Sequence, residues 1–166
     1  MEFLLDGIGF FGPVILFITS LMKLIFMQPY LLGYLILSVI NLLINRGLKS
    51  YLQVPRPKDS RSFIGEQYEK AEQYGMPSHH AQSVFFSLTY NYLVKPQLIP
   101  FIFELFICIV TLLQRHKYNN HTWDQLIVGT LLGCILGIVG ANYIRSQLRV
   151  DWEKGEKIEP EPVETA

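Results

Sequence analysis

The sequence predicts an all-α protein, a polytopic transmembrane helix bundle of about five spans. Half of the 166 residues are apolar, and they gather in runs with almost no charge. Each run approaches the ~17–25 residues that a helix needs to cross ~30 Å of hydrocarbon. The runs are apolar on every side instead of in a stripe of period 3.6, which favours helices in lipid over buried helices of a soluble bundle.

The expected spans are, in order, Phe10 to Met27, Pro29 to Asn45, Ser78 to Val94, Leu98 to Gln114 and Gln125 to Ile144. The first contains one charge, Lys23, while the second and the fifth contain none. The third and fourth are shorter or more polar, and we expect them to span with support from neighbouring helices. This gives a membrane-embedded domain at residues 1–145 and a charged, disordered tail at 146–166.

Charge and cysteine content narrow the function classes. The formal net charge is zero and no basic stripe or zinc-type spacing occurs, so nothing points to nucleic acid. The start of the chain lacks the basic region of a signal peptide. Cys108 and Cys134 lie inside expected spans, where we interpret them as small packing residues.

Three motifs concentrate the basic and imidazole side chains at the ends of spans. They are Lys49-x6-Arg56-Pro57, Pro77-Ser78-His79-His80 and Arg115-x5-His121. Because the chain changes sides at each span, all three motifs fall on one membrane face, here called side A; the opposite face is side B. Lys and Arg divide eight to six between the side A and side B halves, so the positive-inside rule gives no orientation.

The first motif suits a phosphate group. Arg supplies a planar fork of donors and Lys a compact charge. Arg56 lies between Pro55 and Pro57, which restrict the backbone on both sides and aim its guanidinium. The alternative is a helix stop with Lys49 and Arg56 reaching to the membrane surface.

The second motif is typical of the start of a helix that binds an anion. Ser78 is the expected N-cap, and the first backbone N–H groups and the helix dipole attract negative charge. His79 and His80 follow directly, and one of them could protonate a departing oxygen near neutral pH. Capping combined with two interfacial imidazoles is the alternative.

The third motif provides a nucleophile. His121, Asp124 and Gln125 fall at i, i+3 and i+4, so two groups able to orient an imidazole share its face. A neutral, oriented imidazole can attack phosphorus. Thr122-x-x-Gln125 is also a capping box for the fifth span, and both interpretations hold together because the cap fixes His121.

Together these residues resemble the phosphatidic acid phosphatase type 2 superfamily, which includes vanadium haloperoxidases. Residues 74–82 (Tyr-Gly-Met-Pro-Ser-His-His-Ala-Gln) and the run from Arg115 to Gln125 are most similar to the dolichyldiphosphatases, over about residues 42–140. The resemblance implies a phosphate held by Lys49, Arg56, Ser78, His79 and Arg115, a proton from His80 and attack by His121. It implies no metal or other cofactor. It also implies that the substrate is a lipid used in glycosylation. In a eukaryote, the implied location of the protein is the endoplasmic reticulum.

Three positions depart from the superfamily pattern. Gln125 stands where most members have Asp, as in the dolichyldiphosphatases, and Asp124 lies one residue early. Gln114 replaces a Ser before the Arg, which alters one phosphate contact. His79 replaces a small residue in the anion loop, which narrows the pocket and adds a second imidazole.

The sequence thus predicts an integral membrane phosphatase that converts a polyprenyl or dolichyl diphosphate to the monophosphate through a phosphohistidine at His121. Its partners are the lipid phosphate and the bilayer. Two alternatives stay open: the same chemistry on phosphatidate or another lipid phosphate, and a non-catalytic lipid-binding scaffold. A scaffold has no need of all five of Lys49, Arg56, His80, Arg115 and His121.

Three further expectations concern packing. The loop from Ser60 to Gly75 mixes aromatic and acidic residues, so it is either a lid at the membrane interface or a solvated connector. Glycines recur every fourth residue at Gly129, Gly133 and Gly137, which predicts close packing of the fifth span on another helix. Lys23 and Glu104 should lie at similar depth near side B and face each other; reaching to the surface is the alternative for Lys23.

Overall fold

A computed structural model describes residues 2–61, 63 and 73–156 of the chain. The helices are α1 Glu2–Leu24, α2 Gln28–Leu52, α4 His79–Val94, α5 Leu98–Lys117 and α6 Trp123–Glu156. They confirm the predicted all-α class. Most of the predicted interfacial loop, residues 64–72, and the end of the chain, residues 157–166, lie outside the described residues.

Four of the helices are long and apolar enough to cross a membrane: α1, α2, α5 and the part of α6 that ends at Leu148. Their outer faces expose large apolar side chains such as Ile36, Phe103 and Val139, as expected for contact with lipid. The chain is therefore an integral membrane protein.

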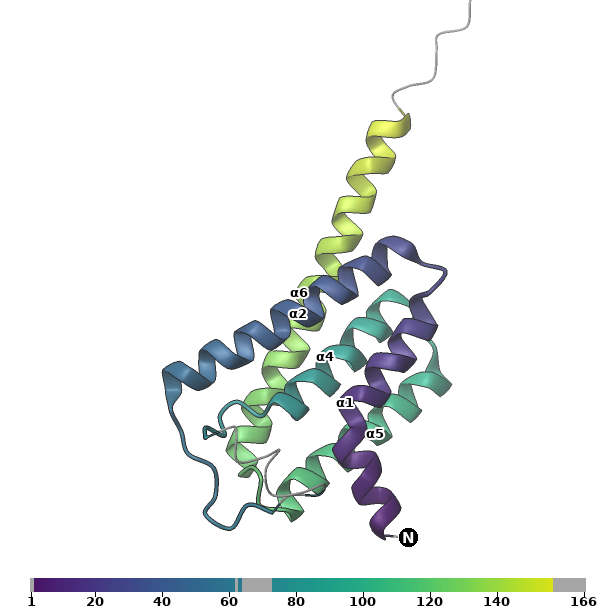
Figure 1. The fold of residues 1–166 in the computed structure, drawn as a ribbon. Coiled ribbons are helices and arrows are strands. Elements are labelled where there is room, and N and C mark those ends of the chain that lie inside the picture. The colour runs from purple at the N-terminus through teal and green to yellow at the C-terminus, as the bar shows by residue number, and fades with distance from the viewer. Residues whose placement is uncertain (1, 62, 64–72, 157–166) are drawn as a thin grey trace, which may run out of the picture.

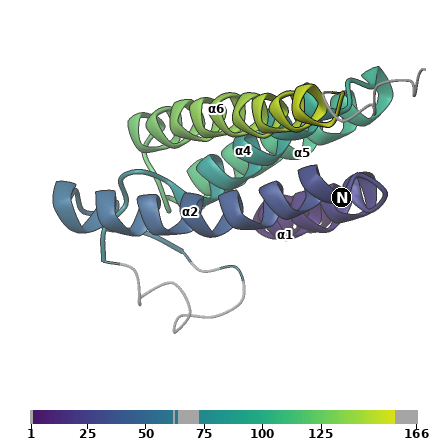
Figure 2. The same ribbon diagram turned by 90° about the horizontal axis from the view of Figure 1, so that it is seen from above.

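The third expected span differs from the other four. It forms α4, which has 16 residues and is about 24 Å long at 1.5 Å per residue. Ala81, Val84 and Tyr90 of α4 are completely buried, so the other helices enclose it. Figure 2 shows α4 between α6 on one side and the pair α1 and α2 on the other.

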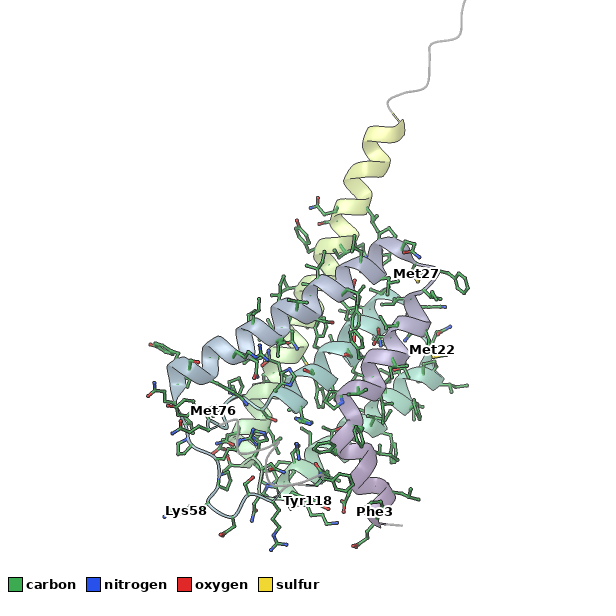
Figure 3. The ribbon with its side chains drawn as sticks, in the orientation of Figure 1. Phe3, Met22, Met27, Lys58, Met76 and Tyr118 are labelled. Carbon is green, nitrogen blue, oxygen red and sulfur yellow. The ribbon has the colours of Figure 1, made fainter. Side chains whose placement is uncertain are left out.

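The helix bundle has two distinct ends. α1 and α2 meet at a short turn and separate toward their other ends, and α6 extends beyond the remaining helices (Figure 1). Lys58, Met76, Tyr118 and Phe3 lie toward the lower end of the view in Figure 3, whereas Met22 and Met27 lie at the opposite end. The loops that carry the three motifs therefore meet at one end of the bundle, as the parity of the spans predicted.

Helix boundaries correct two expectations. α2 continues to Leu52, so Lys49 belongs to its last turn instead of following it. α6 continues to Glu156, so residues 146–156, predicted as part of a disordered tail, are helical. The physical reason is local: this segment contains Arg, Gln, Leu, Glu and Lys, which favour helix, and the next proline is Pro160.

The glycine-rich face of α6 packs on α4, as predicted. A Cβ atom added to Gly129 would lie 2.6 Å from the backbone oxygen of Ser78, and one on Gly133 would lie 2.9 Å from the backbone nitrogen of Phe86. Only glycine allows this approach. It brings the start of α6, which follows the third motif, to the start of α4, which contains the end of the second motif.

Polar contacts fix α1 against α5 in antiparallel orientation. Near side A, Lys117 Nζ donates to Asp6 Oδ2 at 2.9 Å. Near side B, Lys23 Nζ lies 3.7 Å from Glu104 Oε1, and both side chains are at most 9% exposed. The predicted pairing of Lys23 with Glu104 is confirmed. Cys108 and Cys134 are free thiols, and Cys108 lies in the apolar core.

Candidate active site

The first motif is held by the end of α2 and by the loop before α4. Gln53 adopts a left-handed conformation with φ of 51° and donates its N–H to the Lys49 carbonyl at 3.0 Å, which ends α2. The chain then runs beside Tyr74 and Gly75, where the Gly75 N–H donates to the Val54 carbonyl at 2.8 Å. This contact places the segment that contains Arg56 next to the second motif. Lys49 is buried, with 7% of its surface exposed.

The second motif opens α4 as predicted. Ser78 is the N-cap, and its Oγ accepts from the Ala81 N–H at 3.5 Å. The backbone N–H of Ser78 donates to the Gln125 carbonyl at 3.0 Å, which ties the start of α4 to the first turn of α6. Ser78 is fully buried, so this helix start faces the interior of the protein.

The third motif forms a tight turn between α5 and α6, built around Asn120. Asn119 takes a φ of 53°, and the N–H groups of Asn120 and His121 both donate to the Arg115 carbonyl, at 3.0 and 3.3 Å. The Asn120 carbonyl in turn accepts from Arg56 Nη1 at 3.2 Å. The fully buried Asn120 thus joins the first and third motifs. Asn120 is one of the unspecified positions of the motif Arg115-x5-His121, so the motif itself gave no signal for it.

Gln125 orients the ring of His121 and determines its tautomer. Gln125 Nε2 donates to the Pro55 carbonyl at 3.0 Å, which places Oε1 toward the Thr122 N–H at 3.3 Å and toward His121 Nδ1 at 3.1 Å. Because an amide oxygen can only accept, Nδ1 of His121 carries the proton. Nε2 then keeps its lone pair, as a nucleophile requires.

The same contacts confirm the capping box at the start of α6. The Gln125 N–H donates to Thr122 Oγ1 at 3.5 Å, and its side chain returns to the Thr122 N–H. Because α6 begins at Trp123, His121 lies in the turn before the helix, not on a helical face. Asp124 is exposed to solvent in the first helical turn, so the orienting contact comes from Gln125.

The surroundings of His121 favour its neutral form. The residue is 2% exposed, and this burial is the main cause that holds its pKa well below the usual range. The cations of Arg56, Lys49 and Arg115 lower the pKa further, against a smaller opposing effect of the Gln125 hydrogen bond. The cations of the first and third motifs therefore act on one imidazole, and they keep it unprotonated near neutral pH.

His80 and Arg115 form the other side of the site. Arg115 Nη1 lies 3.2 Å from His80 Nε2, and since a guanidinium can only donate, this ring nitrogen accepts. The Phe10 ring of α1 lies beneath both groups, 5.2 Å from Arg115 Cζ and 6.0 Å from the centre of the His80 ring. No signal in the sequence singles out Phe10, because aromatic residues are common in apolar spans.

A buried amide network supports the second motif from α2. Asn45 Nδ2 donates to Gln82 Oε1 at 2.7 Å and to the Pro77 carbonyl at 3.2 Å, while Gln82 Nε2 donates to Asn41 Oδ1 at 2.8 Å. All three amide residues are at most 3% exposed. The sequence analysis did not identify these three residues. Two Asn residues four positions apart in an otherwise apolar span do, however, indicate a polar contact inside the bundle.

Eight predicted site residues gather at the side A end: Lys49, Arg56, Ser78, His79, His80, Arg115, His121 and Gln125. Asp124 is the ninth and faces outward. Gln114, expected to alter a phosphate contact, is buried against Gly9 of α1. Across residues 2–61, 63 and 73–156, no group of three His, Cys, Asp or Glu side chains is placed to hold a metal ion.

Comparison with known proteins agrees with this geometry. A family model described as the PAP2 superfamily matches residues 30–149, which is well over half of the chain and contains all three motifs. The chain belongs to the PAP2 superfamily. Among curated proteins, it is 31% identical over 116 residues to lipid phosphate phosphatase gamma of Arabidopsis thaliana, which covers 63% of this chain and 48% of that protein. The PAP2 chain thus spans about half the length of this relative. No solved structure matches the present chain.

Proposed function

We propose that this PAP2 protein is a lipid diphosphate phosphatase that hydrolyses a polyprenyl or dolichyl diphosphate to the monophosphate, with its active site in residues 1–145. The observation that carries the proposal is the His121–Gln125 contact, which leaves a lone pair on a buried nitrogen among three cations. A scaffold that only bound lipid would have no use for a tautomer fixed in this way. The expected location in a eukaryote is the endoplasmic reticulum membrane.

In the first step, His121 Nε2 attacks the terminal phosphorus and forms an N–P bond, while the bond from that phosphorus to the bridging oxygen breaks. His80, a neutral acceptor for Arg115 in the unliganded site, takes up one proton from solvent when the anionic substrate binds. It gives that proton to the departing oxygen, and the lipid monophosphate leaves. Lys49, Arg56 and Arg115 stabilise the equatorial oxygens, whose charge is greatest in the transition state. In this mechanism a phosphate oxygen replaces His80 as the acceptor for Arg115.

In the second step, water attacks the phosphohistidine and gives a proton to His80. The N–P bond breaks, inorganic phosphate leaves, and both imidazoles return to their starting states. No step needs a metal ion, and the resemblance implied none. The cations of Lys49, Arg56 and Arg115 take the place of a metal as the source of positive charge.

A comparison of three substrates tests the proposal. Phosphate release by the purified protein in detergent with EDTA should give the highest kcat/KM with polyprenyl diphosphate, and lower values with polyprenyl monophosphate and phosphatidate. A preference for phosphatidate would favour the other lipid phosphatase activity. No release from any of the three would favour a non-catalytic scaffold.

A pair of histidine variants tests the mechanism. His121→Ala should remove turnover and the acid-labile phosphoenzyme, because it removes the nucleophile. His116→Ala is the matched control: His116 belongs to α5, and its ring packs on Trp123 with 4.5 Å between ring centres. The control should keep wild-type activity. More than trace activity in a folded His121→Ala protein would show that the assigned mechanism is wrong.

A further inference from the structure

His79 stands beside the proposed active site but has no part in the two-step mechanism. Its side chain is half-buried, and its ring is nearly perpendicular to that of His80, with 6.4 Å between ring centres. On the same helix, Ser83 Oγ lies 3.3 Å from His79 Nε2. A second imidazole held at this position is a candidate for substrate selection.

The contacts from α2 determine how His79 is presented. Asn41 Oδ1 accepts from Gln82, so the amide nitrogen of Asn41 faces Ser83 and donates to its Oγ at 3.4 Å. Ser83 can then direct its own proton to Nε2 of His79. In the neutral ring the remaining proton is on Nδ1, which makes this nitrogen a hydrogen-bond donor.

His79 also lines a groove that is open at the surface of the helix bundle. The groove lies over α4 between α1 and α2 and has a volume of about 280 Å³. Pro13 and Phe17 of α1, Leu42 of α2 and Phe86 of α4 give it apolar walls. α4 lines it from Ser87 to His79, a length of about 12 Å at 1.5 Å per residue.

The proposed reaction requires space for the leaving group at this position. Attacking and leaving oxygens or nitrogens lie roughly in line on opposite sides of the transferred phosphorus. The lipid monophosphate therefore departs on the His80 side, away from His121. Its phosphate must lie next to His80, and its hydrocarbon chain must continue into an apolar space.

We propose that Nδ1 of His79 binds the lipid-proximal phosphate of a diphosphate substrate, whose hydrocarbon chain lies in the groove between α1 and α2. The inference rests on the proposed function, and it adds a specificity residue and a chain site to it. A lipid monophosphate carries no second phosphate, so it cannot make the His79 contact. His79 thus favours diphosphates over monophosphates by an interaction that only one of them has.

Removal of the imidazole tests the specificity. His79→Ala should lower kcat/KM for polyprenyl diphosphate about tenfold, the effect of one hydrogen bond to a charged group, and leave the monophosphate within about twofold. His79→Gln keeps a donor and should recover part of the selectivity. Tyr92→Ala, an exposed position on α4, is the control and should behave as wild type.

Filling the groove tests the chain site. Ser38 of α2 lines the groove, whereas Leu35 of the same helix is exposed outside its lining. Ser38→Phe should raise KM for polyprenyl diphosphate several-fold with little change in kcat, because it removes binding that the ground and transition states share. Hydrolysis of inorganic pyrophosphate, which has no chain, should not change. Leu35→Phe should leave both substrates unaffected.

The outcomes separate this inference from the proposed function. Equal losses on diphosphate and monophosphate in His79→Ala, or no loss on either, would overturn the role of His79 while diphosphate hydrolysis stands. An unchanged KM in Ser38→Phe would overturn the chain site. A wild-type protein that cleaves only monophosphates would overturn the diphosphate function, and the inference with it.

Discussion

In the candidate active site at the side A end basic groups lie beside other basic groups, whereas at the side B end a basic group lies beside an acid. Arg115 contacts His80, and Arg56, Lys49 and Arg115 act together on His121. At the other end Lys23 faces Glu104, whose Oε1 also accepts from Asn91 at 3.1 Å. Lys49, Arg115 and His121 at the first end and Glu104 and Asn91 at the second are buried in the same protein.

The difference separates a binding site from a structural contact. Burial of an ion is costly, and an opposite charge inside the protein offsets part of that cost, as at Lys23 and Glu104. Gathering several cations around two neutral imidazoles adds repulsion instead, and an anionic ligand converts that repulsion into binding energy. Substitutions at the two ends should therefore affect different properties, activity at side A and stability at side B.

The largest expected effect is on catalysis at side A. His80→Ala should slow turnover by about 10²–10⁴-fold, because the leaving oxygen loses its proton donor. The midpoint of thermal unfolding in detergent should change little. Phosphate release and the unfolding midpoint, measured on the same preparation, check both parts. A large loss of stability with nearly normal turnover would reverse the distinction between the two ends.

The next effect is on stability at side B. Lys23→Met and Glu104→Gln should each lower the free energy of unfolding by on the order of 3 kcal/mol, because each leaves its partner buried without the opposite charge. Turnover should stay within about threefold of wild type. Denaturant unfolding in detergent provides the measurement.

The double variant sharpens the same prediction. Lys23→Met combined with Glu104→Gln should recover part of the summed loss, since no uncompensated charge remains. Strictly additive losses would mean that the 3.7 Å contact contributes nothing to stability. A loss of catalysis beyond the loss of folded protein would assign side B a role that its distance from His121 does not support.

A smaller effect concerns the orientation of His121. A Cβ atom on Gly75 would lie 2.5 Å from Gln125 Oε1, so Gly75→Ala should displace this amide and lower kcat about tenfold. Gly47→Ala on α2 is the matched control, because its new Cβ meets nothing within 4 Å. It should keep full activity and gain up to about 1 kcal/mol of stability. Equal activities of the two variants would argue against the Gln125 contact.

The smallest effect is a shift in the pH profile. The neighbouring Arg56 cation disfavours the imidazolium form of His121 and so lowers its pKa. Arg56→Gln should raise that pKa, and the acidic limb of kcat/KM should move to higher pH, by about one unit or less. Lys58→Gln, an exposed neighbour, should leave the limb in place. A shift of the limb to lower pH would contradict the assigned electrostatics.

The sequence was sufficient for the class of fold and for most of the site. Charge-poor runs of membrane length predicted the helices, because the backbone must satisfy its own hydrogen bonds in hydrocarbon. The change of side at each span then placed Lys49, His80 and His121 on one face. The glycine spacing of α6 and the pairing of Lys23 with Glu104 followed from equally local rules.

Only the tertiary structure could decide between alternatives that the sequence left equal. Asp124 and Gln125 are adjacent in the chain, and packing against Gly75 and Pro55 selects Gln125 as the partner of His121. Arg56 meets the Asn120 carbonyl, and Phe10 meets Arg115, from segments far apart in the sequence. Such contacts depend on how helices and turns approach one another, whereas spans and caps depend on a residue's own neighbours and on the bilayer. The sequence therefore determined which groups reach side A, and the fold determined which of them touch.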